Sequence, residues 1–252
     1  AGVYIDELNE GHVTSWFADL NNRTGPGASN RTFEILKHML NKAEEWGYRL
    51  ENTNPCRSVR PNRKRQCERF MTNEELARLG SELAKSRASE DRTKQCAGAA
   101  LTLLLLTGCR KSEILTLEWS DVKGNRLHLR DSKTGPRTVW LGSAARQVIA
   151  ALPRFERIPY PFGNYSYSKP LRCVNGFWRR LRDEAGLPGV RIHDLRHTFA
   201  SHAAMNKETL PMIGRLLGHA NVQTTARYAH LDDGHLLEAV QQIGDLLECM
   251  LN

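Results

Sequence analysis

The feature that most constrains the fold is an apolar segment near the middle of the chain. Ala99–Leu106 is interrupted only by Thr102, and it lies within a longer stretch, Cys96–Thr107, that is predicted to form a buried helix. The apolar run is far too short to span a membrane. Such a helix needs other elements packed around it. The sequence therefore predicts a globular fold with a sizeable core, for which 40% hydrophobic residues in a chain of 252 suffice.

The charge balance points to a polyanionic partner. Lys and Arg total 36 against 28 Asp and Glu, which gives a net charge of +8. This excess fits nucleic acid, although charge alone is weak support. The six cysteines are scattered and form no CxxC pair, so free thiols in a reducing cytoplasm are expected rather than a disulfide framework. The first residues are acidic where a signal peptide would be basic.

The N-terminal part is predicted to be helical and to end in a basic linker. Asp6–Leu20 and Arg31–Arg49 have the spacing of amphipathic helices, and Gly25-Pro26-Gly27 separates them. A basic stretch interrupted by proline follows, Arg57–Arg69, and it is the best candidate for a domain boundary. Its cations suit a solvated linker and a strap against DNA phosphates equally well. The candidates for DNA-backbone contact in this stretch are Arg60, Arg63, Lys64 and Arg65.

The rest of the chain is predicted to be helical around one small antiparallel sheet. Thr72 and Glu75 have the spacing of a capping box at the start of a helix. Arg126–Arg130 and Arg137–Leu141 alternate polar and apolar residues and form a predicted hairpin. The chain after Val174 is expected to be helical, with breaks at residues 186–189 and around Gly218.

The polar residues that could take part in catalysis or binding are concentrated in a few segments, but each has an ordinary explanation by itself. Arg110 could be a surface residue or could pair with Glu113, and Tyr228 could be a packing aromatic. His193 and His197 are four residues apart, as metal ligands on a helix can be. No cysteine or carboxylate cluster completes a ligand set, so a zinc hydrolase is disfavoured. His197 and His202 are expected to be structural histidines.

The order of these segments is more specific than any one of them. The text TGCRKSEILTLEWSDV is followed by SKTGPRTVWL, then HDLRHTFASH, then LLGHANVQTTARYAHL. The chain therefore resembles the tyrosine recombinases of the phage integrase family, over about residues 70 to 232. A softer resemblance links AEEWG, NP and RFMTNEEL to the end of the family's core-binding domain and its join to the catalytic domain.

The resemblance implies a mainly α fold with a small antiparallel β-sheet. Its domains would be a partial helical core-binding domain over residues 1–58, a basic linker over 59–69, a catalytic domain over 70–232 and a tail helix over 233–252. Leu236, Val240, Ile243, Leu247 and Met250 give the tail an apolar face. That face could pack on its own domain, or on a neighbouring protomer in a DNA-bound assembly, which is favoured.

The resemblance also assigns a role to each site residue. Arg110 and Arg196 would hold the non-bridging oxygens of a DNA phosphate. Lys133, at the hairpin tip, would protonate the departing 5′ oxygen, and Tyr228 would be the nucleophile. His193 would hydrogen-bond the phosphate and assist proton removal, and His219 would donate to a phosphate oxygen. Glu113 would orient Arg110. Lys111 would be either a phosphate contact or a solvated side chain.

The implied function is site-specific recombination of double-stranded DNA through a 3′-phosphotyrosine, without metal or other cofactor. A prophage or mobile-element integrase is the favoured kind. It would act as a tetramer on DNA, and a monomer is the candidate state without DNA. It would work in the cytoplasm, associated with the bacterial nucleoid and away from membranes, with accessory DNA-bending or directionality factors as possible partners. The rival interpretations are a type IB topoisomerase-like enzyme and a catalytically silent DNA-binding protein.

Overall fold

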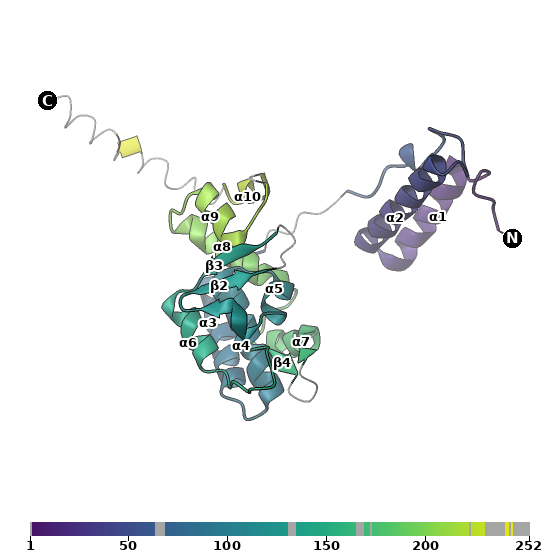
Figure 1. Cartoon of the computed structure of the whole chain (residues 1–252). Coiled ribbons are helices and arrows are strands. Elements are labelled where there is room, and N and C mark those ends of the chain that lie inside the picture. The colour runs from purple at the N-terminus through teal and green to yellow at the C-terminus, as the bar shows by residue number, and fades with distance from the viewer. Residues whose placement is uncertain are drawn as a thin grey trace. The chain divides into compact units, whose positions relative to one another are not determined.

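The computed structural model of the chain describes residues 2–63, 69–130, 135–164, 169–171, 173–221, 223–229, 240–241 and 243. It forms two compact units, Ala1–Cys67 and Glu68–Asn252 (Figure 1). Helices dominate, with a small antiparallel sheet in the second unit, which confirms the predicted fold class. No helix within the described ranges is long and apolar enough to cross a membrane.

The N-terminal unit is built on two helices. They are α1 (Glu10–Thr24) and α2 (Pro26–Glu45), and a short 3-10 turn, η1 (Pro55–Arg57), follows them. The predicted bounds were displaced by several residues. Helix α1 starts late because the Asn9 side chain accepts a hydrogen bond from the His12 amide, and α2 starts as early as Pro26 because only Gly25, at φ 79°, separates the helices. Their small core comprises Val13, Phe17, Phe33, Leu40 and Cys56.

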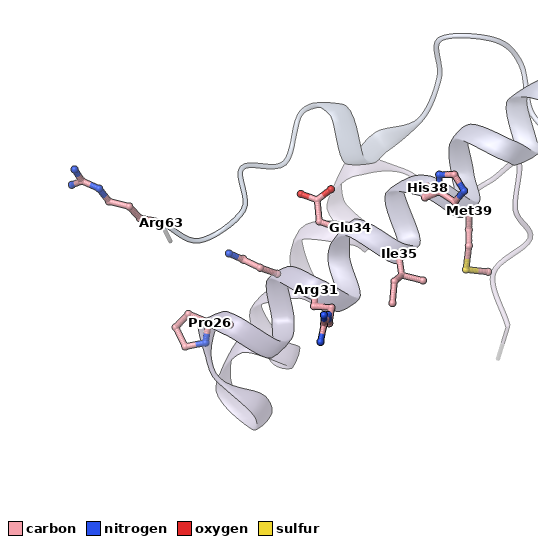
Figure 2. A pocket seen from close by; sticks show the side chains of 9 residues that line it. Pro26, Arg31, Glu34, Ile35, His38, Met39 and Arg63 are labelled. Carbon is pink, nitrogen blue, oxygen red and sulfur yellow. The ribbon is translucent and has the colours of Figure 1, made fainter. Parts of the chain in front are cut away.

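A hollow lies along the exposed side of α2 (Figure 2). The chain after η1 is held against α2 by two hydrogen bonds of 2.8 Å. They run from Asn62 N to Asn30 Oδ1 and from Asn30 Nδ2 to Asn62 O. Arg63, at the end of this segment, lines the hollow together with Glu34 and Met39 of α2. The beginning of the basic stretch therefore packs against its own unit.

The apolar helix of the C-terminal unit is α4 (Arg92–Thr107), and it is buried as predicted over most of its length. It packs against α3 (Asn73–Arg87), α6 (Ser143–Ala150) and α8 (Ile192–Met205). Leu106 differs from its neighbours and is 38% exposed. The predicted capping box at the start of α3 is confirmed, since Thr72 accepts from the Glu75 amide and Glu75 accepts from the Thr72 amide.

The predicted hairpin is confirmed as two strands, β2 (Arg126–Leu129) and β3 (Arg137–Trp140). They pair antiparallel, with Leu127 opposite Val139 and both side chains in the core. A two-residue strand, β1 (Val122–Lys123), extends this sheet after the turn η2 (Trp119–Asp121), and β4 (Gly163–Asn164) pairs with β5 (Lys169–Pro170) elsewhere. The hairpin tip, including Lys133, lies outside the described residues.

The chain after Val174 is helical in the described ranges, as predicted. Its other elements are α7 (Asn175–Glu184), α9 (Leu210–Leu217) and α10 (Gln223–Ala226), and α5 (Lys111–Leu115) lies earlier, directly after α4. Helices α8, α9 and α10 gather at one end of the unit, close to β3 (Figure 1). Of the predicted tail helix, only Val240, Gln241 and Ile243 are described, so its packing stays a prediction.

Candidate active site

Arg110 lies where α4 ends and α5 begins. Gly108 ends α4 in the left-handed conformation, at φ 62°, and turns the chain so that Arg110 becomes the N-cap of α5. Its Nη1 is 2.8 Å from Oε1 of Glu113, a residue that is 4% exposed. Its Nη2 donates to the carbonyl of Gly218 at 3.1 Å. The guanidinium group is therefore held from two sides.

Glu113 also pairs with a second arginine, which the sequence analysis did not single out. Nη2 of Arg137, on β3, is 2.8 Å from Glu113 Oε2, and its Nη1 donates to the Leu216 carbonyl at 3.0 Å. A Cβ added to Gly218 would come within 2.6 Å of Arg137 Cδ, so this close approach requires glycine. Arg137 thus ties the sheet to the end of α9 and to the carboxylate that holds Arg110.

Arg196 occupies the interior of the same region. It is 5% exposed, and its Nη1 and Nη2 donate to the carbonyls of Gly108, at 2.6 Å, and Leu217, at 2.8 Å. Burial, followed by the charges of Arg110 and Arg137, lowers its pKa to about 10, so it stays a cation at neutral pH. Arg110 and Arg196 therefore bind the adjacent carbonyl groups of Gly218 and Leu217, although they come from different helices.

His219 comes directly after those two carbonyl groups. Its Nδ1 is 2.9 Å from the hydroxyl of Thr225, which is fully buried. Partial burial, followed by the charges of Arg196 and Arg110, lowers the pKa of His219 to about 4. The imidazole is neutral at physiological pH and can act as a hydrogen-bond donor beside two cations.

Tyr228 and the histidines of α8 form a second contact series. Tyr228 is 5% exposed and packs with Ala200, Ala204, Ile213 and Leu217. Its hydroxyl is 2.7 Å from Nδ1 of His197. The rings of His193 and His197 meet edge to face, with centroids 4.8 Å apart. These contacts therefore connect Tyr228 to the helix face that carries His193 and Arg196.

The two histidines of this series differ in exposure. His193 is exposed to solvent, whereas His197 is 7% exposed. Desolvation by the surrounding protein, followed by the charges of Arg196 and Arg191, lowers the pKa of His193. The pKa of His197 falls to about 4, mainly through burial and then through His193 and Arg227. Both imidazoles are therefore uncharged at neutral pH, and each has a nitrogen lone pair with which it can accept a proton.

A hollow of about 580 Å³ opens beside His193 and Arg196. Its wall is rich in cations: Lys111, Arg179, Arg182, Arg191 and Arg196. Lys111 is exposed and contacts Asn175 Oδ1 at 3.4 Å. A surface of this charge and shape suits an anionic oxygen or a phosphate group.

The remaining candidates lie in the other unit or outside the described residues. Arg60 and Arg63 are exposed residues of the N-terminal unit, and Lys64 and Arg65 lie outside the described residues, as Lys133 does. Within the described ranges, no three His, Cys, Asp or Glu side chains cluster as a metal site would require.

Two residues with clear contacts to the site escaped the sequence reasoning. Arg137 stood in the motif SKTGPRTVWL without a role, and His197 was expected to be structural. Period-two alternation would have shown only that Arg137 is a strand residue, not that it reaches Glu113. For His197 a usable signal existed: it is four residues after His193 on a helix, so the two share a face.

Comparison with known proteins gives this arrangement a context. The profile of the phage integrase family matches residues 69–235. The integrase of Escherichia phage 186 is 29% identical over 212 residues, which are 83% of this chain and 57% of the relative. The tyrosine recombinase XerC of Thermodesulfovibrio yellowstonii is 29% identical over 201 residues, which are 73% of this chain and 65% of the relative.

The fold agrees with solved structures of such enzymes. A lambda integrase dimer bound to a COC′ core site superposes with a TM-score of 0.71 at 16% identity, over 90% of this chain and 82% of that one. The chain belongs to the phage integrase family, the tyrosine recombinases. It spans less than two thirds of the length of the two curated relatives named above.

Proposed function

We propose that the chain is a site-specific DNA recombinase that cuts and rejoins strands through a 3′-phosphotyrosine on Tyr228. The observation that carries the proposal is the convergence of Arg110 and Arg196 on the adjacent carbonyls of Gly218 and Leu217, next to His219. Two fixed guanidinium groups and a neutral donor histidine suit the non-bridging oxygens of a phosphodiester. Family membership supports the same conclusion.

The reaction is a pair of transesterifications. The Tyr228 oxygen attacks the phosphorus and forms a phosphotyrosyl bond, and the bond from phosphorus to the 5′ oxygen breaks. The phenol proton leaves to a neutral base, for which His193 is proposed, and Lys133 protonates the departing oxygen. Arg110 and Arg196 offset the charge that builds on the phosphate, with no divalent cation in the step. A 5′ hydroxyl of another strand reverses these bond changes and releases Tyr228.

Glu113 supports this chemistry without touching the phosphate. Burial alone would raise the pKa of its carboxyl group, but hydrogen bonds from Arg137 and from the Arg110 backbone outweigh burial and lower it. The ionised carboxylate fixes Arg110, and through Arg137 it fixes the end of α9. Lys111 is proposed as a further backbone contact, from its place beside the cationic hollow.

The partners follow from the same function. Double-stranded DNA carrying a recombination site is the proposed substrate, and Arg60, Arg63, Lys64 and Arg65 are proposed to contact its backbone. Recombination joins four strands, so we propose a tetramer on DNA, with the tail beyond residue 232 docking on a neighbour. Action on the nucleoid of a bacterial cytoplasm, as a prophage or mobile-element integrase, belongs to this proposal.

Trapping of the covalent adduct tests the function. The core site is first found by sequencing the junctions of the element that carries the gene. A duplex of that site, nicked so that the cleaved fragment diffuses away, accumulates any phosphotyrosyl adduct, which gel electrophoresis under denaturing conditions detects. Wild-type protein and Tyr160→Phe are expected to form the adduct, and Tyr228→Phe is expected to form none.

Two outcomes contradict the proposal. An adduct formed by Tyr228→Phe refutes the nucleophile, and the absence of adduct with wild-type protein on its own junction indicates a silent DNA-binding protein. A two-site recombination assay beside a supercoil relaxation assay separates recombination from topoisomerase activity. Relaxation without recombination refutes the assignment as a recombinase.

A further inference from the structure

The hydrogen bond between His197 and Tyr228 has no part in the mechanism described above. It joins residues 31 positions apart, with 2.7 Å between Nδ1 and the phenol oxygen. Both residues are buried, at 7% and 5% exposure. A buried hydroxyl that loses its partner costs the free energy of desolvation, so this contact strongly favours one orientation of the phenol.

His197 is an uncharged partner in this hydrogen bond. The imidazole is neutral at physiological pH, because burial and then His193 and Arg227 lower its pKa to about 4. A neutral imidazole has one donor and one acceptor nitrogen, and a protonated phenol can both donate and accept. Nδ1 and the Tyr228 oxygen therefore form a hydrogen bond between two neutral groups, and the tautomer of His197 decides which of them donates.

The apolar neighbours of Tyr228 hold its ring but leave its polar end undirected. Ala200 and Ala204 of α8, with Ile213 and Leu217 of α9, form the cluster that receives the ring. His197 stands one residue after Arg196 and one helical turn after His193. A bond to His197 therefore keeps the hydroxyl beside the two residues proposed to act on the phosphate and on the phenol proton.

We propose that His197 is a positioning residue for the nucleophile: its Nδ1 is hydrogen-bonded to the Tyr228 oxygen and holds that oxygen at the face of α8 that carries His193 and Arg196. This inference rests on the proposed function of Tyr228. It deepens that function by adding a residue that touches neither the DNA nor the reacting phosphorus. Displacement of a reacting group by about 1 Å is enough to slow a reaction about 10²-fold.

Variants at His197 separate positioning from packing. In single-turnover cleavage of the nicked duplex at saturating protein, His197→Ala is expected to be slower than wild type by about 10²-fold, with unchanged affinity for DNA. His197→Asn places an amide near the position of Nδ1 and is expected to recover at least tenfold of that loss. His197→Gln places its amide near Nε2 and is expected to recover little.

His202→Asn is the matched control, because His202 lies on the same helix and its Nε2 is 3.4 Å from the carbonyl of Met71. It is expected to cleave at the wild-type rate. A wild-type rate for His197→Ala, or equal rates for the Asn and Gln variants, overturns the inference. If Tyr228 itself forms no adduct, the proposed function fails, and that result is distinct from a loss confined to the His197 variants.

A measurement without DNA tests the hydrogen bond independently. Tyr228→Phe is expected to lower the melting temperature of the wild-type protein by about 2–4 °C, the effect of one net hydrogen bond in a domain of this size. The same substitution in a His197→Ala background is expected to lower it by less. An equal decrease in both backgrounds overturns the inference, whatever the activity assays give.

Discussion

Glu113→Gln is expected to destabilise the C-terminal unit by about 3 kcal/mol at neutral pH. The carboxylate accepts three hydrogen bonds of 2.8 Å, from Arg110 Nη1, from Arg110 N and from Arg137 Nη2, and its side chain is 2% exposed. Breaking a buried ion pair from one side costs about 3–5 kcal/mol. The lower value applies here, because the amide keeps one acceptor oxygen and Arg110 is partly exposed.

The assay has to report on one unit of a chain that has two. Hydrogen exchange of peptides from α4, the buried helix of the C-terminal unit, gives the opening free energy of that unit alone. Glu82→Gln serves as the control, since Glu82 pairs with the exposed Lys85 on α3, and this substitution is expected to cost at most about 1 kcal/mol. A cost for Glu113→Gln no greater than that of the control refutes the buried triad as a source of stability.

The pH dependence gives a second criterion for the same variant. The folded pKa of Glu113 lies below the ordinary value of 4.5, so its contribution is complete above that pH and is lost as the pH falls through the folded pKa. The difference between wild type and Glu113→Gln is therefore expected to be constant near neutrality and to shrink in acid, measured by hydrogen exchange of the same α4 peptides at each pH. A difference that is the same at pH 7 and in acid contradicts the assignment of an ionised carboxylate.

Two further predictions concern backbone strain and histidine burial. Gly108→Ala is expected to destabilise the protein by more than Gly124→Ala. The two glycines have a similar left-handed φ, 62° and 60°, but an added Cβ at Gly108 would lie 2.6 Å from Phe199 Cδ1, whereas one at Gly124 would meet open space. Equal melting temperatures for the two variants would falsify this reasoning. The pKa values of His197 and His219 are lowered from 6.5 to about 4, so the unfolded chain binds protons at a higher pH than the folded chain does. Stability is therefore expected to fall as the pH drops from 6.5 towards 4, and to fall less steeply in His197→Asn. Parallel curves of melting temperature against pH for wild type and this variant would rule out the contribution of His197.

Local features of the fold were predictable because they depend on a few neighbouring residues. The capping box of Thr72 and the pairing of β2 with β3 follow from side-chain chemistry within a short window. The start of α2 was misplaced for a related reason. Gly25-Pro26-Gly27 was taken as a break of several residues, whereas proline is well suited to the first turn of a helix, so the helix absorbs all but Gly25.

The contacts of the site were predictable only in part. The pair of Glu113 with Arg110 was expected and is present at 2.8 Å, whereas the other residues were predictable as a set and not as a geometry. The ordered motifs named Arg110, Arg196, His219 and Tyr228 because each has a counterpart in the resembling family. No local pattern says that Arg137 reaches the Glu113 carboxylate, because that contact depends on how β3 meets the end of α9. Tertiary packing decides such pairs, and periodicity carries no information about them.

The ends of two helices explain how the guanidinium group of Arg196 can be kept buried in this unit. Helices α4 and α9 both end at glycines in the left-handed conformation, Gly108 and Gly218. The carbonyl groups at such ends have no partner within the helix and carry partial negative charge. Gly108 and Leu217 direct theirs to Arg196, and Gly218 directs its own to Arg110.

Backbone carbonyl groups thus hold the guanidinium group of Arg196 in place, as the carboxylate of Glu113 holds that of Arg110. A carboxylate on Arg196 would neutralise the cation, whereas carbonyl groups satisfy its donors and leave the net charge free to act on an anion. This is why the glycines matter to function as well as to stability. A side chain at Gly218 would displace Arg137, and a side chain at Gly108 would collide with Phe199 and with Leu217, whose carbonyl holds Arg196.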